Sequence, residues 1–174
     1  MKVAKVKTLV IAALFASIIC VATFVVKIPS PATNGYFNLG DCFVLLCGML
    51  LNPLYGALAA GIGSALADIL SGYIQYAPAT FVIKAAMALS FYYIYRAANK
   101  KLPMISKIIA GIVAETIMVF GYFGYEAFVL GYGIGAIGSV FSNTLQGIVG
   151  IAAAFAVSEA INKSKTLNEF FRKG

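Results

Sequence analysis

The chain has 174 residues, of which 61% are apolar and 11% are charged, and its formal net charge is +7. Water-soluble domains contain about 25% charged residues, so this composition excludes a soluble globular protein and indicates an integral membrane protein. The sequence contains no histidine, which excludes a haem, a His-ligated zinc site and a Ser-His hydrolase. Cys20, Cys42 and Cys47 lie in or beside apolar runs and are interpreted as small apolar side chains rather than a disulfide framework. We predict neither a metal site nor a cofactor.

Six apolar segments are predicted to be membrane helices, because about 20 apolar residues cross a hydrocarbon core about 30 Å thick. In chain order they cover residues 8–26, 39–51, 54–70, 79–96, 105–125 and 137–161. The first segment follows three lysines, like the start of a signal peptide, but its length favours a retained helix. The predicted fold class is therefore an all-α integral membrane protein with six transmembrane helices in one domain, residues 1–174.

The basic residues indicate the orientation of this bundle. Of the 13 Lys and Arg residues, all except Lys27 and Lys84 lie near the N-terminus, near the connection between the fourth and fifth helices, or near the C-terminus. The positive-inside rule places these regions in the cytoplasm. We therefore expect a multi-pass protein of the cell membrane with both termini in the cytoplasm. The expected membrane is the plasma membrane of a bacterium. The loops at 27–41, 71–77 and 125–137 then share the outer side.

The loop at 27–41 is long and has a distinct composition. Pro29 and Pro31 end the first helix, and Asn34-Gly35 signals a turn. Long loops in compact domains often cover binding sites, so we expect a lid in which residues 36–39 touch a ligand. The alternative is a plain external connector.

Ionisable residues inside the predicted spans point to a buried polar site. Asp68, Lys84 and Glu115 each lie within an apolar run, where a charge costs about 2.5 to 3.5 kcal/mol unless it faces the bundle interior or water. Helical spacing groups further polar residues on shared faces. For Asp68 the alternative is the outer interface, and for Lys84 with Glu115 it is a structural ion pair. Asp41 and Glu126 remain without an assigned role.

We therefore predict a substrate site between the outer halves of the last three helices and the outer loops. Its candidate residues are Asn38, Tyr76, Phe81, Lys84, Glu115, Tyr122, Asn143 and Gln146. Lys84 is the expected charged anchor. Asn143 and Gln146 would alternatively form interhelical hydrogen bonds, and Tyr76 would belong to an interfacial aromatic belt.

The sequence argues against an enzyme. GIGSALAD, residues 61–68, lacks the lysine of a phosphate-binding P-loop and lies inside a predicted span, so ATP hydrolysis is not expected of this chain. The six acidic residues are scattered singly, which disfavours an intramembrane hydrolase or transferase. A stand-alone channel or secondary transporter is a further alternative, although no inverted repeat is apparent.

Three stretches carry a resemblance to a known family. They are GYFNLGD (residues 35–41), NPLYGALAAGIGSALADILSGY (52–73) and YAPATFVIKAAMA (76–88). Together they closely resemble the substrate-binding S components of energy-coupling factor (ECF) vitamin transporters. The resemblance covers nearly the whole chain, because length and helix number also agree.

The resemblance implies a function and partners. An S component binds a vitamin near the outer face and docks on a transmembrane coupling protein with two ATPase subunits. The family's small-residue motif on the first helix corresponds to Ala12 and Ala16, which would contact the coupling protein. The S component would then topple in the membrane to release its cargo. The motifs look most like members for hydroxymethylpyrimidine or vitamin B6, with riboflavin or pantothenate as alternatives.

Overall fold

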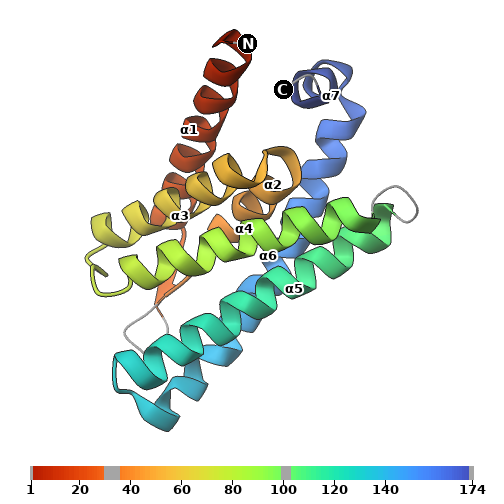
Figure 1. The fold of residues 1–174 in the computed structure, drawn as a ribbon. Helices are drawn as coiled ribbons and strands as arrows, with labels where there is room; N and C mark the ends of the chain where they lie inside the picture. Colours follow the sequence, from red (N-terminus) through yellow and green to blue (C-terminus); the bar gives the residue numbers. More distant parts are fainter. Residues whose placement is uncertain (1, 30–35, 99–102, 173–174) are drawn as a thin grey trace.

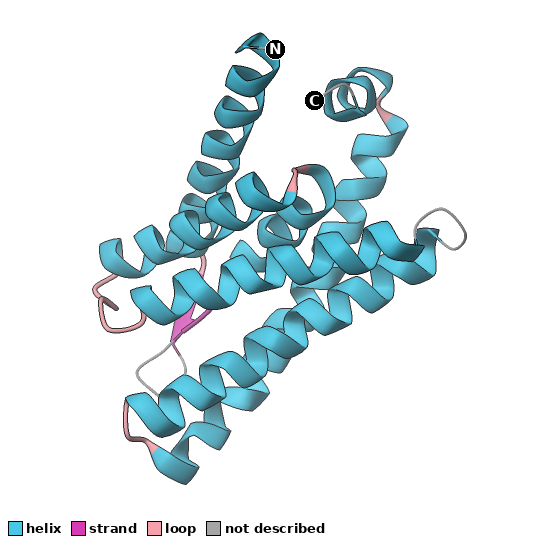
Figure 2. Cartoon of the chain, viewed as in Figure 1, coloured by secondary structure: helices cyan, strands magenta, loops and turns pink. Residues whose placement is uncertain are grey.

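Apolar helices make up most of the chain, in the order that the sequence predicts. The computed structural model describes residues 2–29, 36–98 and 103–172. Within these residues the elements are α1 (Lys2–Val25), β1 (Lys27–Pro29), β2 (Tyr36–Asn38), α2 (Gly40–Leu50), α3 (Pro53–Leu70), α4 (Ala77–Ala98), α5 (Pro103–Gly124), the π-helix η1 (Tyr125–Val129), the 3-10 helix η2 (Gly133–Ala136), α6 (Ile137–Lys163) and α7 (Lys165–Arg172). Figure 2 shows the helices as the main mass of the molecule, with one short strand pair.

Five helical segments of the described chain are long and apolar enough to cross a membrane. They are Val6–Val25, Pro53–Leu70, Ala77–Ala97, Pro103–Val129 and Gly133–Lys163. The segment expected at 39–51 is instead the shorter helix α2, which has 11 residues. At 1.5 Å per residue α2 is about 16 Å long, roughly half of the hydrocarbon core. The structure therefore has five full-length candidates where the sequence predicts six.

The short helix α2 is the centre of the core. It packs against α1, α3, α4 and α6, and Val44, Leu45 and Cys47 along it are fully buried. A helix that begins at membrane depth exposes N–H groups, which is tolerated only where protein surrounds it. The enclosure of α2 therefore allows its N-terminus, with Asp41 in the first turn, to lie inside the bundle.

The small residues of α1 are used for packing against α3. A Cβ atom added to Gly63 of α3 would lie 2.5 Å from the carbonyl oxygen of Ala16, and Ala12 is only 6% exposed. Small residues on both helices thus permit close approach of the two backbones. In this structure the backbone of Ala16 packs against α3, and docking of a coupling protein at Ala12 and Ala16 stays a prediction. The large apolar residues Leu9 and Leu14 are exposed.

The segment after α1 forms a hairpin. β1 pairs with β2 in antiparallel register, with Lys27 opposite Asn38. Lys27 also donates a hydrogen bond to Ser71 in the turn between α3 and α4, at 3.0 Å. Pro31 and the Asn34-Gly35 turn of the expected lid lie outside the described residues. The lid therefore stays a prediction.

The two termini meet at one end of the molecule (Figure 1). There α7, which the sequence analysis did not anticipate, folds back toward α1. Lys7 donates a hydrogen bond to the carbonyl oxygen of Phe170 at 2.9 Å and lies 4.2 Å from the centroid of its ring. Phe15 and Phe171 pack edge to face, with centroids 6.3 Å apart. The helix α7 thus links the end of α6 to α1.

Candidate functional site

A buried ion pair joins α4 to α2. Lys84 Nζ donates to Asp41 Oδ1, and the two side chains are 3% and 0% exposed. Asp41 lies in the first turn of α2, where the backbone N–H groups and the helix dipole favour a negative charge. Lys84 lies between the buried residues Ile83 and Met87 on α4. The pairing allows both charges to lie inside an apolar bundle.

The network continues to α6 and β2 through Gln146. Its Nε2 donates to Asp41 Oδ2 at 2.5 Å, and its Oε1 accepts from the backbone N–H of Asn38 at 2.7 Å. Asn38 Oδ1 accepts from the N–H of Gly40 at 2.8 Å, at the start of α2. Both carboxylate oxygens of Asp41 therefore have donors, and one network joins four elements.

Glu115 of α5 lies beside this network but is not bonded into it. It is 5% exposed, and neither carboxylate oxygen has a hydrogen-bond partner among the described residues. A Cβ atom added to Gly150 would lie 3.1 Å from Glu115 Oε1 and 3.0 Å from Asp41 Cβ, so both acids border this glycine of α6. Burying polar oxygens without donors costs free energy, so Glu115 is where an additional hydrogen-bond donor is needed. We refer to Asn38, Asp41, Lys84, Glu115 and Gln146 as the carboxylate-lysine cluster.

An aromatic layer adjoins the cluster. Lys84 Nζ lies 5.5 Å from the ring centroid of Tyr122, whose hydroxyl is 3.0 Å from Thr80 Oγ1. The centroids of Tyr122 and Tyr76 are 6.4 Å apart. Tyr76 donates to Glu126 Oε1 at 3.0 Å, and Ser139 donates to Glu126 Oε2. Rings and hydroxyls of α4, α5 and α6 thus gather next to the buried charges.

Comparison with known proteins identifies the family. The family model described as "ECF-type riboflavin transporter, S component" matches residues 3–163. The chain belongs to this family. A Pyrococcus woesei protein described as an uncharacterized protein in the gap 3′ region is 35% identical over 134 residues, which are 76% of this chain and 86% of that protein.

A solved structure of the S component of a bacterial ECF transporter is similar in fold, with a TM-score of 0.70 and 25% identity. The match covers 92% of this chain and 99% of that structure. This protein is therefore an S component, a non-enzymatic membrane subunit of a transporter. Family membership implies a vitamin substrate and the ECF module as partner, and it confirms the resemblance seen in the sequence.

The S component brings most of the predicted residues together. Asn38, Lys84, Glu115 and Gln146 are members of the carboxylate-lysine cluster, and Tyr76 and Tyr122 form the aromatic layer. Asn143 is buried one turn from Gln146 on α6.

Two expectations differ from the structure. The ring of Phe81 lies against α3, since a Cβ atom added to Gly61 would be 2.8 Å from Phe81 Cδ2, so this ring does not join the cluster. The expected alternative of a Lys84–Glu115 ion pair is also wrong. Lys84 pairs with Asp41 because α2 begins inside the bundle and points its first turn at α4.

Sequence reasoning left Asp41 and Glu126 without a role, and it did not select Thr80. The signal for Asp41 was present: a lysine buried in a membrane needs an acid, and Asp41 opens an apolar helix. Asp68, which the sequence places inside a predicted span together with Glu115, is buried on α3 and is 4% exposed. Its backbone carbonyl accepts from the N–H of Tyr73 at 2.8 Å.

Proposed function

We propose that this S component binds riboflavin at the carboxylate-lysine cluster and delivers it for uptake. The observation that carries the proposal is Glu115, a buried carboxylate without a donor among the described residues, beside a lysine and a set of aromatic rings. Riboflavin has a fused heteroaromatic ring with carbonyl oxygens and an N–H group, and a hydroxylated side chain. It therefore offers donors to Glu115, acceptors to Lys84 and a flat face to tyrosine rings.

The proposed roles follow from the hydrogen-bonding capacity of each group. The ammonium of Lys84 has further N–H donors besides the one used for Asp41, and these would bind a ring carbonyl. Glu115 would accept from the ring N–H or from hydroxyl groups. Asn143 and Gln146 would bind the hydroxylated chain, and Tyr76 and Tyr122 would contact the ring. The family comparison does not support hydroxymethylpyrimidine or vitamin B6 as substrate.

The proposed orientation and assembly use the ends of the molecule. The start of α1 and helix α7 lie at one end of the molecule (Figure 1), and the sequence near both termini is rich in lysine, so we place that end in the cytoplasm of the cell. There the S component would dock on the coupling protein and the two ATPases of the ECF module. The proposed docking contacts are Ala12 and Ala16 of α1, although the backbone of Ala16 also packs against Gly63 of α3.

Titration of the purified protein with riboflavin, read by calorimetry, tests the proposal. The Lys84→Met variant keeps the apolar stem, and losing a hydrogen bond from a charged donor should weaken binding by about 10- to 150-fold. Lys107→Met is the matched control, because Lys107 is also a buried lysine in an ion pair, with Glu159. Tighter binding of pyridoxine or hydroxymethylpyrimidine than of riboflavin, or equal loss in both variants, would contradict the proposal.

A further inference from the structure

A cavity of about 690 Å³ lies near the two termini, away from the carboxylate-lysine cluster. Arg96, which lines it, follows Lys84 on α4 by 12 residues, or about 18 Å along the helix axis. Its walls are formed by residues of α1, α2, α4, α6 and α7, and by the short connection that joins α2 to α3. Its volume falls in the range of about 300 to 1,000 Å³ typical of small-molecule sites.

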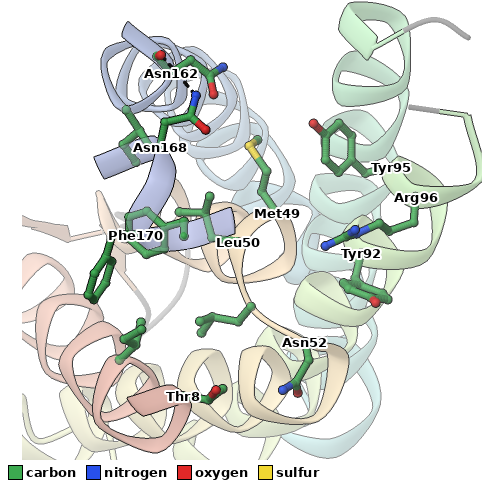
Figure 3. Close-up of a pocket in the computed structure, with 14 residues that line it drawn as sticks. Thr8, Met49, Leu50, Asn52, Tyr92, Tyr95, Arg96, Asn162, Asn168 and Phe170 are labelled. Carbon is green, nitrogen blue, oxygen red and sulfur yellow. Dashed lines mark hydrogen bonds between the residues drawn. The ribbon is translucent and has the colours of Figure 1, made fainter. Parts of the chain in front are cut away.

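Arg96 gives this cavity a positive charge that no described side chain pairs with. Its guanidinium lies 5.3 Å from the ring centroid of Tyr92, and Figure 3 shows it pointing from α4 into the cavity. Among the described residues no carboxylate lines the cavity, and none forms a hydrogen bond or ion pair with Arg96, which is exposed to solvent. A planar guanidinium held on an aromatic ring, with free N–H groups, matches an anion that accepts two parallel hydrogen bonds, and phosphate is the best such fit.

Amide groups add neutral donors around the same space. Asn52 uses its Oδ1 to accept from the N–H of Tyr55 at 3.1 Å, which leaves its NH₂ group as a donor. Asn168 of α7 donates to the carbonyl oxygen of Asn162 on α6 at 3.3 Å, and both line the cavity (Figure 3). These contacts hold the end of α6 and α7 together on the side facing Arg96.

The remaining walls are apolar or aromatic. Tyr95 of α4 and Phe170 of α7 face the space from different sides in Figure 3, and Met49 and Leu50 of α2 lie between them. A ligand that fills the cavity therefore needs an anionic group at Arg96 and an apolar or aromatic body. Inorganic phosphate alone would leave most of the walls without contact.

We propose that this cavity binds a phosphate ester with an aromatic or apolar body, with its phosphate on Arg96. Two sources offer this chemistry at the cytoplasmic side: a phosphorylated flavin and the headgroup of an anionic phospholipid. The cytoplasmic placement rests on the proposed function, whereas the phosphate site rests on the lining residues alone. A bound ester would bridge α4 and α7 and so hold α7 against α1.

The first test uses the full chain with its outer site saturated by riboflavin. Riboflavin 5′-phosphate is then titrated by calorimetry into wild type, Arg96→Gln and Arg96→Lys. We expect Arg96→Gln to weaken binding by about 10- to 150-fold. Arg96→Lys should weaken it less, because the positive charge remains but the two parallel N–H donors of the guanidinium are lost. Lys163→Gln is the charge-matched control, because Lys163 lies at the same end on α6 but does not line the cavity, and it should change affinity by no more than about threefold.

The second test asks whether a lipid is the source. Wild type and Arg96→Gln are placed in nanodiscs of phosphatidylglycerol or phosphatidylcholine, and native mass spectrometry counts the retained lipids. Selective retention of phosphatidylglycerol by wild type assigns the site to a headgroup, and binding only in the first test assigns it to a soluble ester. Hydrogen exchange in residues 165–171 should slow with either ligand in wild type alone.

Equal binding of both phosphate ligands by wild type and Arg96→Gln, with unchanged melting temperatures, overturns the proposal. So does loss of uptake in Arg96→Gln with wild-type phosphate binding in both tests, because Arg96 would then serve contact with the ECF module. Riboflavin affinity, measured in the same samples, reports on the proposed function separately. If the protein does not bind riboflavin, the proposed substrate is wrong. The difference in phosphate-ester binding between wild type and Arg96→Gln would still test the proposed site.

Discussion

Two buried lysines at opposite ends of the bundle show how the same residue serves different purposes. Lys107 of α5 bonds Glu159 at 3.0 Å and Ser158 at 3.3 Å, and the side chain of Glu159 is 51% exposed. Lys84 of α4 pairs with Asp41, which is fully enclosed. The first pair reaches water at a membrane surface, where a long side chain can place its charge. The second has no such outlet.

The difference lies in what surrounds each pair. Ser158 and Glu159 each accept one hydrogen bond from Lys107, and this arrangement links α5 to α6. Around Lys84 a second carboxylate, Glu115, adds acceptor oxygens that no described residue uses. An enclosed charge network with unused acceptors contributes little to the stability of the fold, but it is a suitable place for a polar ligand. Substitutions at and around the two pairs test this difference.

The largest effect is expected from Asp41→Asn. This change leaves Lys84 buried without its counter-charge, and breaking a buried pair in this way costs about 3–5 kcal/mol. Thermal unfolding in detergent should show a large loss of stability, together with loss of riboflavin binding. The double variant Asp41→Asn, Lys84→Met removes both charges and should recover part of that stability. A double variant no more stable than Asp41→Asn would contradict the pairing.

The next effect concerns Gly150, which borders both acids. In Gly150→Ala the new Cβ would lie 3.0 Å from Asp41 Cβ and 3.1 Å from Glu115 Oε1, and overpacking of this kind costs about 1–3 kcal/mol. We expect a lower melting temperature and weaker riboflavin binding. Gly124→Ala is the control, because beyond its own helical turn no atom of the described residues lies within 4 Å of its added Cβ. A Gly150→Ala protein that matches Gly124→Ala would show that α6 does not press on the cluster.

A similar effect is expected from Ala16→Leu on α1. Because the backbone of Ala16 lies against Gly63, added bulk should separate α1 from α3 and cost about 1–3 kcal/mol in the isolated subunit. The melting temperature measures this directly. Leu14→Ala, on the exposed side of α1, serves as the comparison and should change stability little. Loss of uptake by Ala16→Leu with wild-type stability would instead support direct docking through Ala16.

The smallest effect is expected from Lys107→Met. Its partner Glu159 is half exposed, so water can replace the lysine as hydrogen-bond donor once the pair is lost. We expect a smaller shift in melting temperature than for Asp41→Asn and unchanged riboflavin affinity. Loss of riboflavin binding would show that the two lysines are coupled through the bundle.

The sequence by itself determined the class of protein, the order of its helices and most members of the carboxylate-lysine cluster. Apolar runs of spanning length, basic residues at one set of ends and polar residues at helical spacing all follow from local composition. Lys84, Glu115 and Gln146 could therefore be selected without a structure. Their selection needed only the cost of placing polar groups in an apolar medium.

Only the tertiary structure decided which groups meet. Periodicity assigns a residue to a face of its helix but does not say what that face contacts. Lys84 pairs with Asp41, which is 43 residues away in the sequence, rather than with Glu115. The ring of Phe81 packs against Gly61. The enclosure of α2 by four helices and the packing of the Ala16 backbone against Gly63 likewise depend on neighbours distant in sequence. Their physical reason is shared: small residues and short helices become favourable only where another element fills the space beside them.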